Sequence, residues 1–105
     1  MIIEVSFIIT VFNKAKYLPI TIHSILRQTE NLSCEYIFVD DASIDNSSDI
    51  LNHLKNENSW VHVLTLSKNY GQHPSTVAGI LHSSGKWVVT MDEDLQHPPE
   101  KIALL

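Results

Sequence analysis

Short apolar runs alternate with amphipathic stretches along this chain, and the alternation restricts its fold more than any other feature. Four runs rich in β-branched and aromatic residues predict strands at residues 5–12, 36–40, 61–66 and 86–92. The first and last are apolar enough to be expected buried on both faces. Apolar residues recur at helical spacing behind Pro19, after residues 42–49, and between Pro74 and Gly85. The sequence therefore predicts an α/β fold of βαβ units, with a mainly parallel sheet and flanking helices.

Composition excludes several classes of protein. With 105 residues, 44% of them hydrophobic, the chain is long and apolar enough for one globular domain. The net charge is -5 and the seven basic residues are scattered, so nucleic acid is not an expected partner. The single cysteine, Cys34, fits a reducing compartment, and no segment approaches the ~20 apolar residues of a membrane span. A cytoplasmic location is the expectation.

Polar residues follow each predicted strand directly. In open parallel sheets, ligands bind beyond the carboxyl ends of the strands. The four strand ends read TVFN at residues 10–13, VDDAS at 39–43, LSKNYGQ at 66–72 and MDEDLQ at 91–96. We expect these segments to line one shared cleft.

The last of these segments has the composition of a metal site. If the strand continues past Met91, Asp92, Asp94 and Gln96 point to the same side because side chains two apart share a face. Three oxygen donors suit Mg²⁺ or Mn²⁺, and Mg²⁺ leaves coordination positions open for phosphates. An EF-hand calcium loop does not fit the spacing. The alternative is that these acids only stabilise the start of a helix near Pro98.

The acid pair Asp40 and Asp41 ends another strand and leaves two interpretations open. A carboxylate at this point can accept a hydrogen bond from a nucleobase N–H or a ribose hydroxyl. Residues 40–49 are equally suited to a turn and helix cap, with Ser43 or Asp45 accepting free backbone N–H groups. No glycine-rich phosphate loop is present. A metal ion would therefore have to neutralise any phosphates.

Together the strand ends resemble the family 2 glycosyltransferases, which have the Rossmann-like GT-A fold. FIITVFNKAKYLPITIHSILRQT is similar to the opening strand and helix of the family, YIFVDDASIDNS to its nucleotide-binding segment, and MDEDLQHPPE to its D-x-D metal motif. The resemblance covers essentially the whole chain. LSKNYGQHPSTVAGI followed by DEDLQHPPE most resembles the branch with polyprenyl-phosphate acceptors, such as dolichol-phosphate mannose synthases and bactoprenol glucosyltransferases.

The resemblance implies a set of donor-site residues. The metal ion and the diphosphate would be bound by Asp92, Asp94 and Gln96. The residues implied in nucleotide binding are Thr10, Phe12, Asn13, Asp40 or Asp41, Lys68, Asn69 and Gly71.

The implied activity is inverting sugar transfer from a UDP- or GDP-linked donor to a polyprenyl phosphate or a glycan hydroxyl, as in the synthesis of cell-envelope polysaccharides. The catalytic base is expected beyond Leu105. Residues 1–105 would then be the nucleotide-sugar-binding half, truncated after the metal-binding strand, without the acceptor half and inactive alone. We expect homodimers to cover the surface so exposed, and the longer protein to act in the cytoplasm or at the inner face of the plasma membrane.

Two alternatives remain from other functional classes. A non-catalytic α/β binding module would keep the fold and use the acids as caps. A metal-dependent nucleotidyltransferase would also pair acids with a metal ion and a sugar nucleotide.

Overall fold

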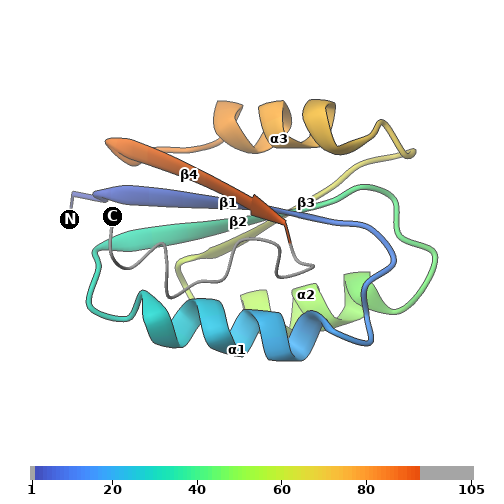
Figure 1. The fold of residues 1–105 in the computed structure, drawn as a ribbon, viewed down its shortest axis with the longest axis horizontal. Coiled ribbons are helices and arrows are strands. Elements are labelled where there is room, and N and C mark those ends of the chain that lie inside the picture. Colours follow the sequence, from blue (N-terminus) through green and yellow to red (C-terminus); the bar gives the residue numbers. More distant parts are fainter. Residues whose placement is uncertain (1, 93–105) are drawn as a thin grey trace.

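The computed structural model describes residues 2–92, and these form a single sheet with three helices. The elements, in chain order, are β1 (Val5–Val11), α1 (Leu18–Gln28), β2 (Cys34–Asp40), α2 (Ser47–Glu57), β3 (Val61–Thr65), α3 (Gln72–Leu81) and β4 (Trp87–Asp92) (Figure 1). The predicted alternation of strands and helices is confirmed.

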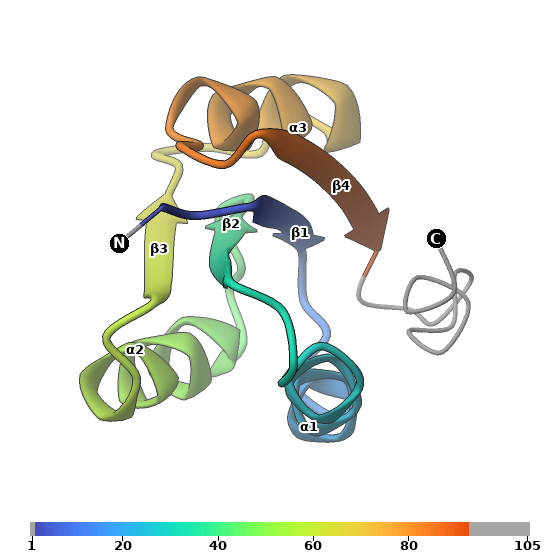
Figure 2. The ribbon, with the colours of Figure 1, turned by 90° about the vertical axis from the view of Figure 1, so that its left-hand side faces the viewer.

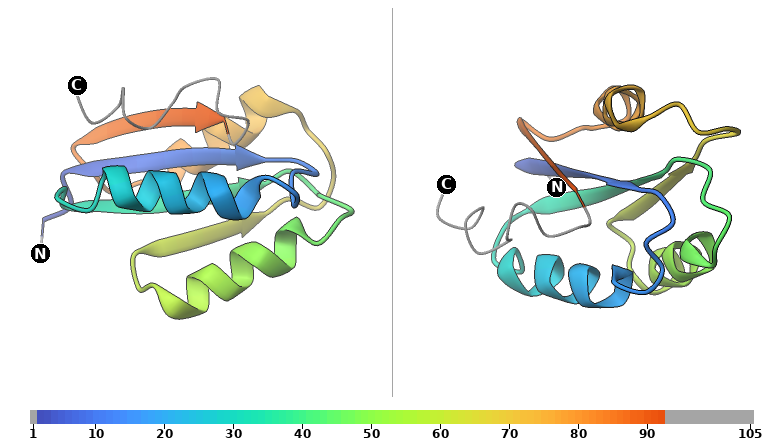
Figure 3. Two further views of the ribbon diagram at one scale, coloured as in Figure 1. Left: turned by 60° about the horizontal axis from the view of Figure 1, so that its bottom comes forward. Right: turned by 45° about the vertical axis from the view of Figure 1, so that its right-hand side comes forward.

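The sheet is parallel throughout, with the strand order β3-β2-β1-β4. Helices α1 and α2 run along one face, and α3 covers the other (Figures 2 and 3). The chain first builds outward from β1 to β2 and β3, then crosses back to place β4 on the opposite side of β1. The strand order thus reverses between β1 and β4, which is where ligands bind in open parallel sheets.

The larger core lies between the sheet and the helices α1 and α2. Alternate side chains of β1 and β2 point to this face, because successive side chains of a strand point to opposite faces. The fully buried members of this core include Phe7, Ile9, Phe38, Leu18 and Leu51.

The opposite face has a thinner core beneath α3. Ile8, Ile37 and Val39 are completely buried there. Helix α3 approaches these strands closely at Gly79, where an added Cβ would collide with the Ile8 side chain. The close approach leaves no room for a side chain at this helix position.

Two strand predictions need correction. β2 begins at Cys34, two residues before the predicted start. The prediction was too short because the polar Glu35 interrupts the apolar pattern. The expected burial on both faces holds for β1 but is wrong for β4, where Trp87 is 69% and Val88 40% exposed. β4 lies at the edge of the described sheet, so its side chains have a neighbouring strand on one side only.

Candidate functional site

All four strands end at the same side of the molecule, which we call the carboxyl edge (Figure 1). Backbone register brings the predicted residues to one level there. Thr10 of β1 pairs with Asp92 at the end of β4, and Asp40 of β2 pairs with Val11 and Thr65. The carboxyl edge therefore gathers strand ends that are up to 82 positions apart in the chain, as Thr10 and Asp92 show.

The loops after β1 and β2 are hydrogen-bonded to each other. The Asn13 N–H donates to Ser43 Oγ at 2.9 Å, and the Ile44 N–H donates to Asn13 Oδ1 at 2.8 Å. Asn13 adopts a left-handed backbone with φ of 52°, a conformation that asparagine tolerates better than most residues. The predicted nucleotide-binding residue Asn13 thus also fixes the shape of the carboxyl edge.

Asp40 is a buried carboxylate with one oxygen in use. It is 1% exposed, and its Oδ1 accepts the Ser43 N–H at 3.0 Å. Its Oδ2 is buried without a hydrogen-bond partner among the described residues. Ala42, two residues after Asp40, has a backbone φ of 62°, a strained conformation for a residue with a side chain. An unpaired buried oxygen beside a strained backbone is a feature found at functional sites.

Asp41 has both oxygens in use. It is 4% exposed, its Oδ1 accepts the Tyr70 N–H at 2.8 Å, and its Oδ2 accepts the Gly71 N–H at 2.9 Å. Asn69 Oδ1 shares the Gly71 N–H at 3.0 Å. Gly71 has φ of 96°, which suits glycine. Asp41 therefore joins the end of β2 to the loop between β3 and α3.

The turn interpretation of residues 40–49 is confirmed in part. The Asp45 carboxylate accepts a hydrogen bond from the Ser47 N–H at the start of α2, at 2.9 Å, and another from the Ala15 N–H at 3.1 Å. Ser43, however, accepts its hydrogen bond from the β1 loop instead of from α2. The segment is thus both a helix cap and a bridge between two loops of the carboxyl edge.

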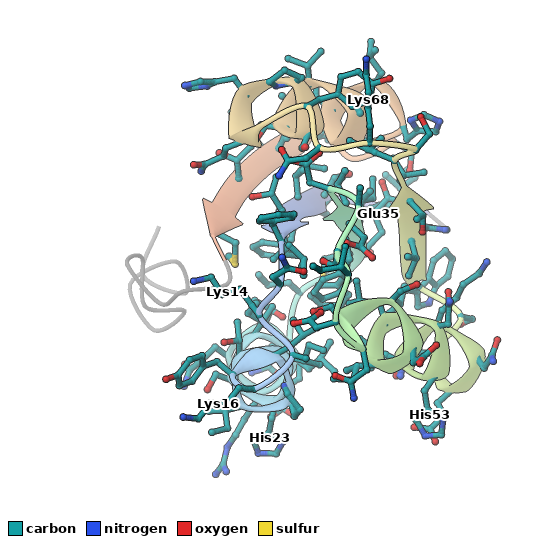
Figure 4. The ribbon with its side chains drawn as sticks, turned by 90° about the vertical axis from the view of Figure 1, so that its right-hand side faces the viewer. Lys14, Lys16, His23, Glu35, His53 and Lys68 are labelled. Atoms are coloured by element: carbon teal, nitrogen blue, oxygen red, sulfur yellow. The ribbon has the colours of Figure 1, made fainter. Side chains whose placement is uncertain are left out.

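Three lysines lie at the carboxyl edge. Lys14 and Lys16 follow β1 and Lys68 follows β3, and in Figure 4 the three lie apart, with Lys68 over α3 and Lys16 beside α1. Lys14 extends toward the end of β4 in that view, and Lys68 lies on the α3 side. Lys14 and Lys16 were not predicted as site residues, because two lysines separated by one alanine do not form a basic run. Their position after β1 was the available signal.

Aromatic side chains accompany the lysines at this edge. Phe12, directly after β1, is 40% exposed, and Lys68 Nζ lies 5.1 Å from the centre of the Tyr70 ring. Lys16 Nζ lies 5.4 Å from the Tyr17 ring. Cations and exposed aromatic faces at the ends of parallel strands are suited to phosphates and planar bases.

The expected metal ligands lie almost entirely outside the described residues. Asp92 is the last residue of β4 and is placed by its backbone, whereas Asp94 and Gln96 lie outside residues 2–92. Within those residues, no group of three or more His, Cys, Asp or Glu side chains is arranged to hold a metal ion. Carboxylate and amide oxygens, the donors of the three expected ligands, are the kind that Mg²⁺ and Mn²⁺ prefer.

A second polar cluster, around Glu35 of β2, was missed from the sequence. The Glu35 side chain is buried, and its Oε2 accepts hydrogen bonds from Ser6 Oγ at 2.6 Å, the Ser84 N–H at 2.7 Å and Ser84 Oγ at 2.9 Å. His62 Nε2 lies 3.3 Å from Oε1, and the Gly85 N–H donates to Ser6 Oγ at 2.8 Å. The Glu35 cluster joins β1, β2 and β3 to the connection between α3 and β4.

Acid should weaken the fold through the Glu35 cluster. Burial alone raises the pKa of the Glu35 carboxyl, but hydrogen bonds from Ser6 and Ser84 outweigh burial and hold its pKa below the usual 4.5. A lowered folded-state pKa stabilises the fold fully above about pH 4.5, and this contribution is lost as the pH falls through the folded-state pKa.

Urea unfolding between pH 7 and pH 3 measures this contribution in the natural chain and in Glu35→Gln. We expect the stability difference between the two proteins to shrink below about pH 4.5. Two parallel stability curves would contradict a lowered pKa at Glu35.

The fold and the carboxyl edge together define a Rossmann-like α/β protein whose polar groups gather at the strand-order reversal. Residues 6–105 match the sequence profile of the family described as glycosyl transferase family 2, and the chain belongs to that family.

Solved structures support the same fold. TarS 1-349 from S. aureus is 25% identical with a TM-score of 0.76, and the match covers 88% of this chain and 28% of TarS. The same protein in complex with UDP-GlcNAc is 25% identical with a TM-score of 0.75, covering 88% of this chain and 27% of the other. The mannosyltransferase PcManGT from Pyrobaculum calidifontis, in complex with GDP-Man and Mn²⁺, is 18% identical and shows the fold alone. Its TM-score is 0.82, with coverage of 98% and 31%.

The chain spans less than a third of the length of these structures. None of the helices within residues 2–92 has the length and apolarity to cross a bilayer.

Proposed function

We propose that this chain is the nucleotide-sugar-binding part of a metal-dependent, inverting glycosyltransferase. The observation that carries the proposal is the register that aligns Thr10, the Asp40 strand end and Asp92 at the carboxyl edge, within a family 2 sequence. The similarity to TarS in complex with UDP-GlcNAc supports a nucleotide-diphosphate sugar as the donor, and we propose a UDP- or GDP-linked one.

The nucleoside is assigned to the loops after β1 and β2. Phe12 offers an exposed aromatic face, and the unpaired Oδ2 of Asp40 is an acceptor suited to a nucleobase N–H. The Asp40 oxygen is buried, so it meets a ligand only if the loop at residues 41–46 adjusts on binding. Thr10 and Asn13 complete this side of the proposed site, and the loop carrying Lys68, Asn69 and Gly71 adjoins it through the hydrogen bonds of Asp41 to Tyr70 and Gly71.

The diphosphate is assigned to the opposite part of the carboxyl edge. Asp92, Asp94 and Gln96 would hold Mg²⁺ or Mn²⁺, which supplies Lewis-acid stabilisation of the departing diphosphate. Lys14 adds a positive charge near the end of β4 (Figure 4). The catalytic base and the acceptor, a polyprenyl phosphate or a glycan hydroxyl, are assigned to a part of the protein beyond Leu105, at or near the cytoplasmic face of a membrane.

Calorimetric titration of UDP and of GDP, with Mn²⁺ and again with EDTA, tests the proposal. We expect one nucleotide to bind in Mn²⁺ and to lose its affinity in EDTA, because the acids alone repel the diphosphate. The nucleotide that binds identifies the base of the donor. Equal binding in EDTA, or no binding of either nucleotide, would contradict a metal-dependent donor site in this chain.

A non-catalytic α/β binding module is the second candidate function. The hydrogen bonds of Asp41 and Asp45 to backbone N–H groups favour it, because both carboxylates already serve the fold. Such a module predicts no Mn²⁺-dependent binding of either nucleotide in the same titration.

A further inference from the structure

The loop between β3 and α3, residues 66–71, is anchored at both ends by the acid pair of β2. The Leu66 N–H donates to the Asp40 carbonyl oxygen at 2.9 Å, and the Tyr70 and Gly71 N–H groups donate to the Asp41 carboxylate. The residues between these anchors, 67–69, are exposed. The carboxylate of Asp41 thus holds the far end of this loop through two hydrogen bonds, and Asn69 Oδ1 shares the second of them.

The anchored end of the loop carries a cation and an aromatic ring. Lys68 Nζ lies 5.1 Å from the centre of the Tyr70 ring, and Tyr70 is 48% exposed. Because the Tyr70 N–H is bound to Asp41, the position of the ring depends on that hydrogen bond. The next residue, Gly71, directly precedes α3, and its carbonyl oxygen accepts hydrogen bonds from the Ser75 N–H at 3.2 Å and from Ser75 Oγ at 2.7 Å.

The two acids of the pair are therefore used differently. Both carboxylate oxygens of Asp41 accept hydrogen bonds from backbone N–H groups, whereas only one oxygen of Asp40 does. A carboxylate that accepts two successive backbone N–H groups fixes the local backbone, as bound anions do in backbone nests.

We propose that Asp41 is a positioning residue, whose carboxylate holds Tyr70 and Gly71 and so keeps the Lys68–Tyr70 pair at the nucleotide site. The pair then determines nucleotide affinity, with the ring presenting a face to the nucleoside and the ammonium group adding a positive charge that attracts the anionic nucleotide as a whole. This inference rests on the proposed function.

Amide hydrogen exchange tests the positioning role without any nucleotide. Asp41→Asn keeps one acceptor oxygen and turns an NH₂ group toward a backbone donor, so one hydrogen bond is lost. We expect the Tyr70 and Gly71 amides to exchange about tenfold faster, and those of β1 to be unchanged. The control is Asp49→Asn, the same chemical change at an exposed acid in the first turn of α2. Unchanged exchange at Tyr70 and Gly71 would overturn the proposal.

A double-mutant cycle tests how Asp41 acts on binding. We expect Asp41→Asn to weaken Mn²⁺-dependent binding of UDP or GDP about tenfold, but to have little further effect when Lys68 and Tyr70 are both alanine. Full additivity of the two losses would overturn the proposal and identify Asp41 as a direct ligand. If the natural chain binds neither nucleotide, the proposed function fails, and with it the assignment of the pair to nucleotide affinity. The exchange result still shows whether Asp41 holds the loop.

Discussion

Replacing Glu35 with alanine is expected to destabilise the protein by about 2 kcal/mol or more, since a buried donor left without an acceptor costs roughly 1–3 kcal/mol. The substitution leaves one such donor, the hydroxyl of the buried Ser6, and it also removes the hydrogen bonds of the exposed Ser84 N–H and hydroxyl, which water can replace. A loss of this size is roughly an eighth to two fifths of the 5–15 kcal/mol that separates folded from unfolded states in typical domains. Urea unfolding followed by circular dichroism at pH 7 measures it.

Two controls separate the hydrogen bonds from the volume of the side chain. Glu35→Gln keeps the size and one acceptor oxygen, so we expect a smaller loss than for alanine. His53→Ala removes an exposed histidine whose ion pair with Glu57 lies on the surface, and it should change stability by about 0.5 kcal/mol or less. If Glu35→Ala costs no more than this surface change, the buried cluster does not stabilise the fold.

The Glu35 cluster also shows why part of the fold was hidden from the sequence. A glutamate in a predicted strand normally indicates a solvent-facing position, and Glu35 is instead buried among donors from β1 and the α3–β4 connection. Ser84 lies 49 positions from Glu35 in the chain, so no local pattern relates the two. The apolar runs of β1 and β2 were sufficient for the fold class, because burial on both faces leaves few polar positions in a parallel strand.

The carboxyl edge was predictable for a similar reason, but its internal contacts were not. Parallel strands bring their ends together, so the polar residues after each strand could be assigned to one region. Whether Asp41 binds a ligand or holds a loop depends on Tyr70, 29 positions away, and that contact follows from the return of the chain through β3. The prediction of a metal motif at residues 92–96 rests on the spacing of its oxygen donors and on the family resemblance, and only Asp92 lies within the described residues.

Replacing Asp92 with alanine is expected to lower the affinity for the nucleotide in Mn²⁺ about 100-fold or more. Changing a residue that only supports a metal ligand costs about 10–100-fold, and loss of a direct ligand should cost at least as much. Asp92 ends β4 in register with Thr10 of β1, so its backbone places it where the strand order reverses. A metal ligand at the end of β4 lies between the nucleoside side of the proposed site and the diphosphate.

The measurement is a calorimetric titration of the nucleotide that binds the natural chain, with Mn²⁺ and with EDTA. In EDTA the natural chain and Asp92→Ala should bind equally weakly, because the lost carboxylate acts only through the metal ion. Asp49→Ala is the matched control and should keep full Mn²⁺-dependent affinity, since Asp49 is exposed in the first turn of α2 and belongs to none of the four strand ends. Equal affinities of Asp92→Ala and the natural chain in Mn²⁺ would remove Asp92 from the metal site and leave capping as its role.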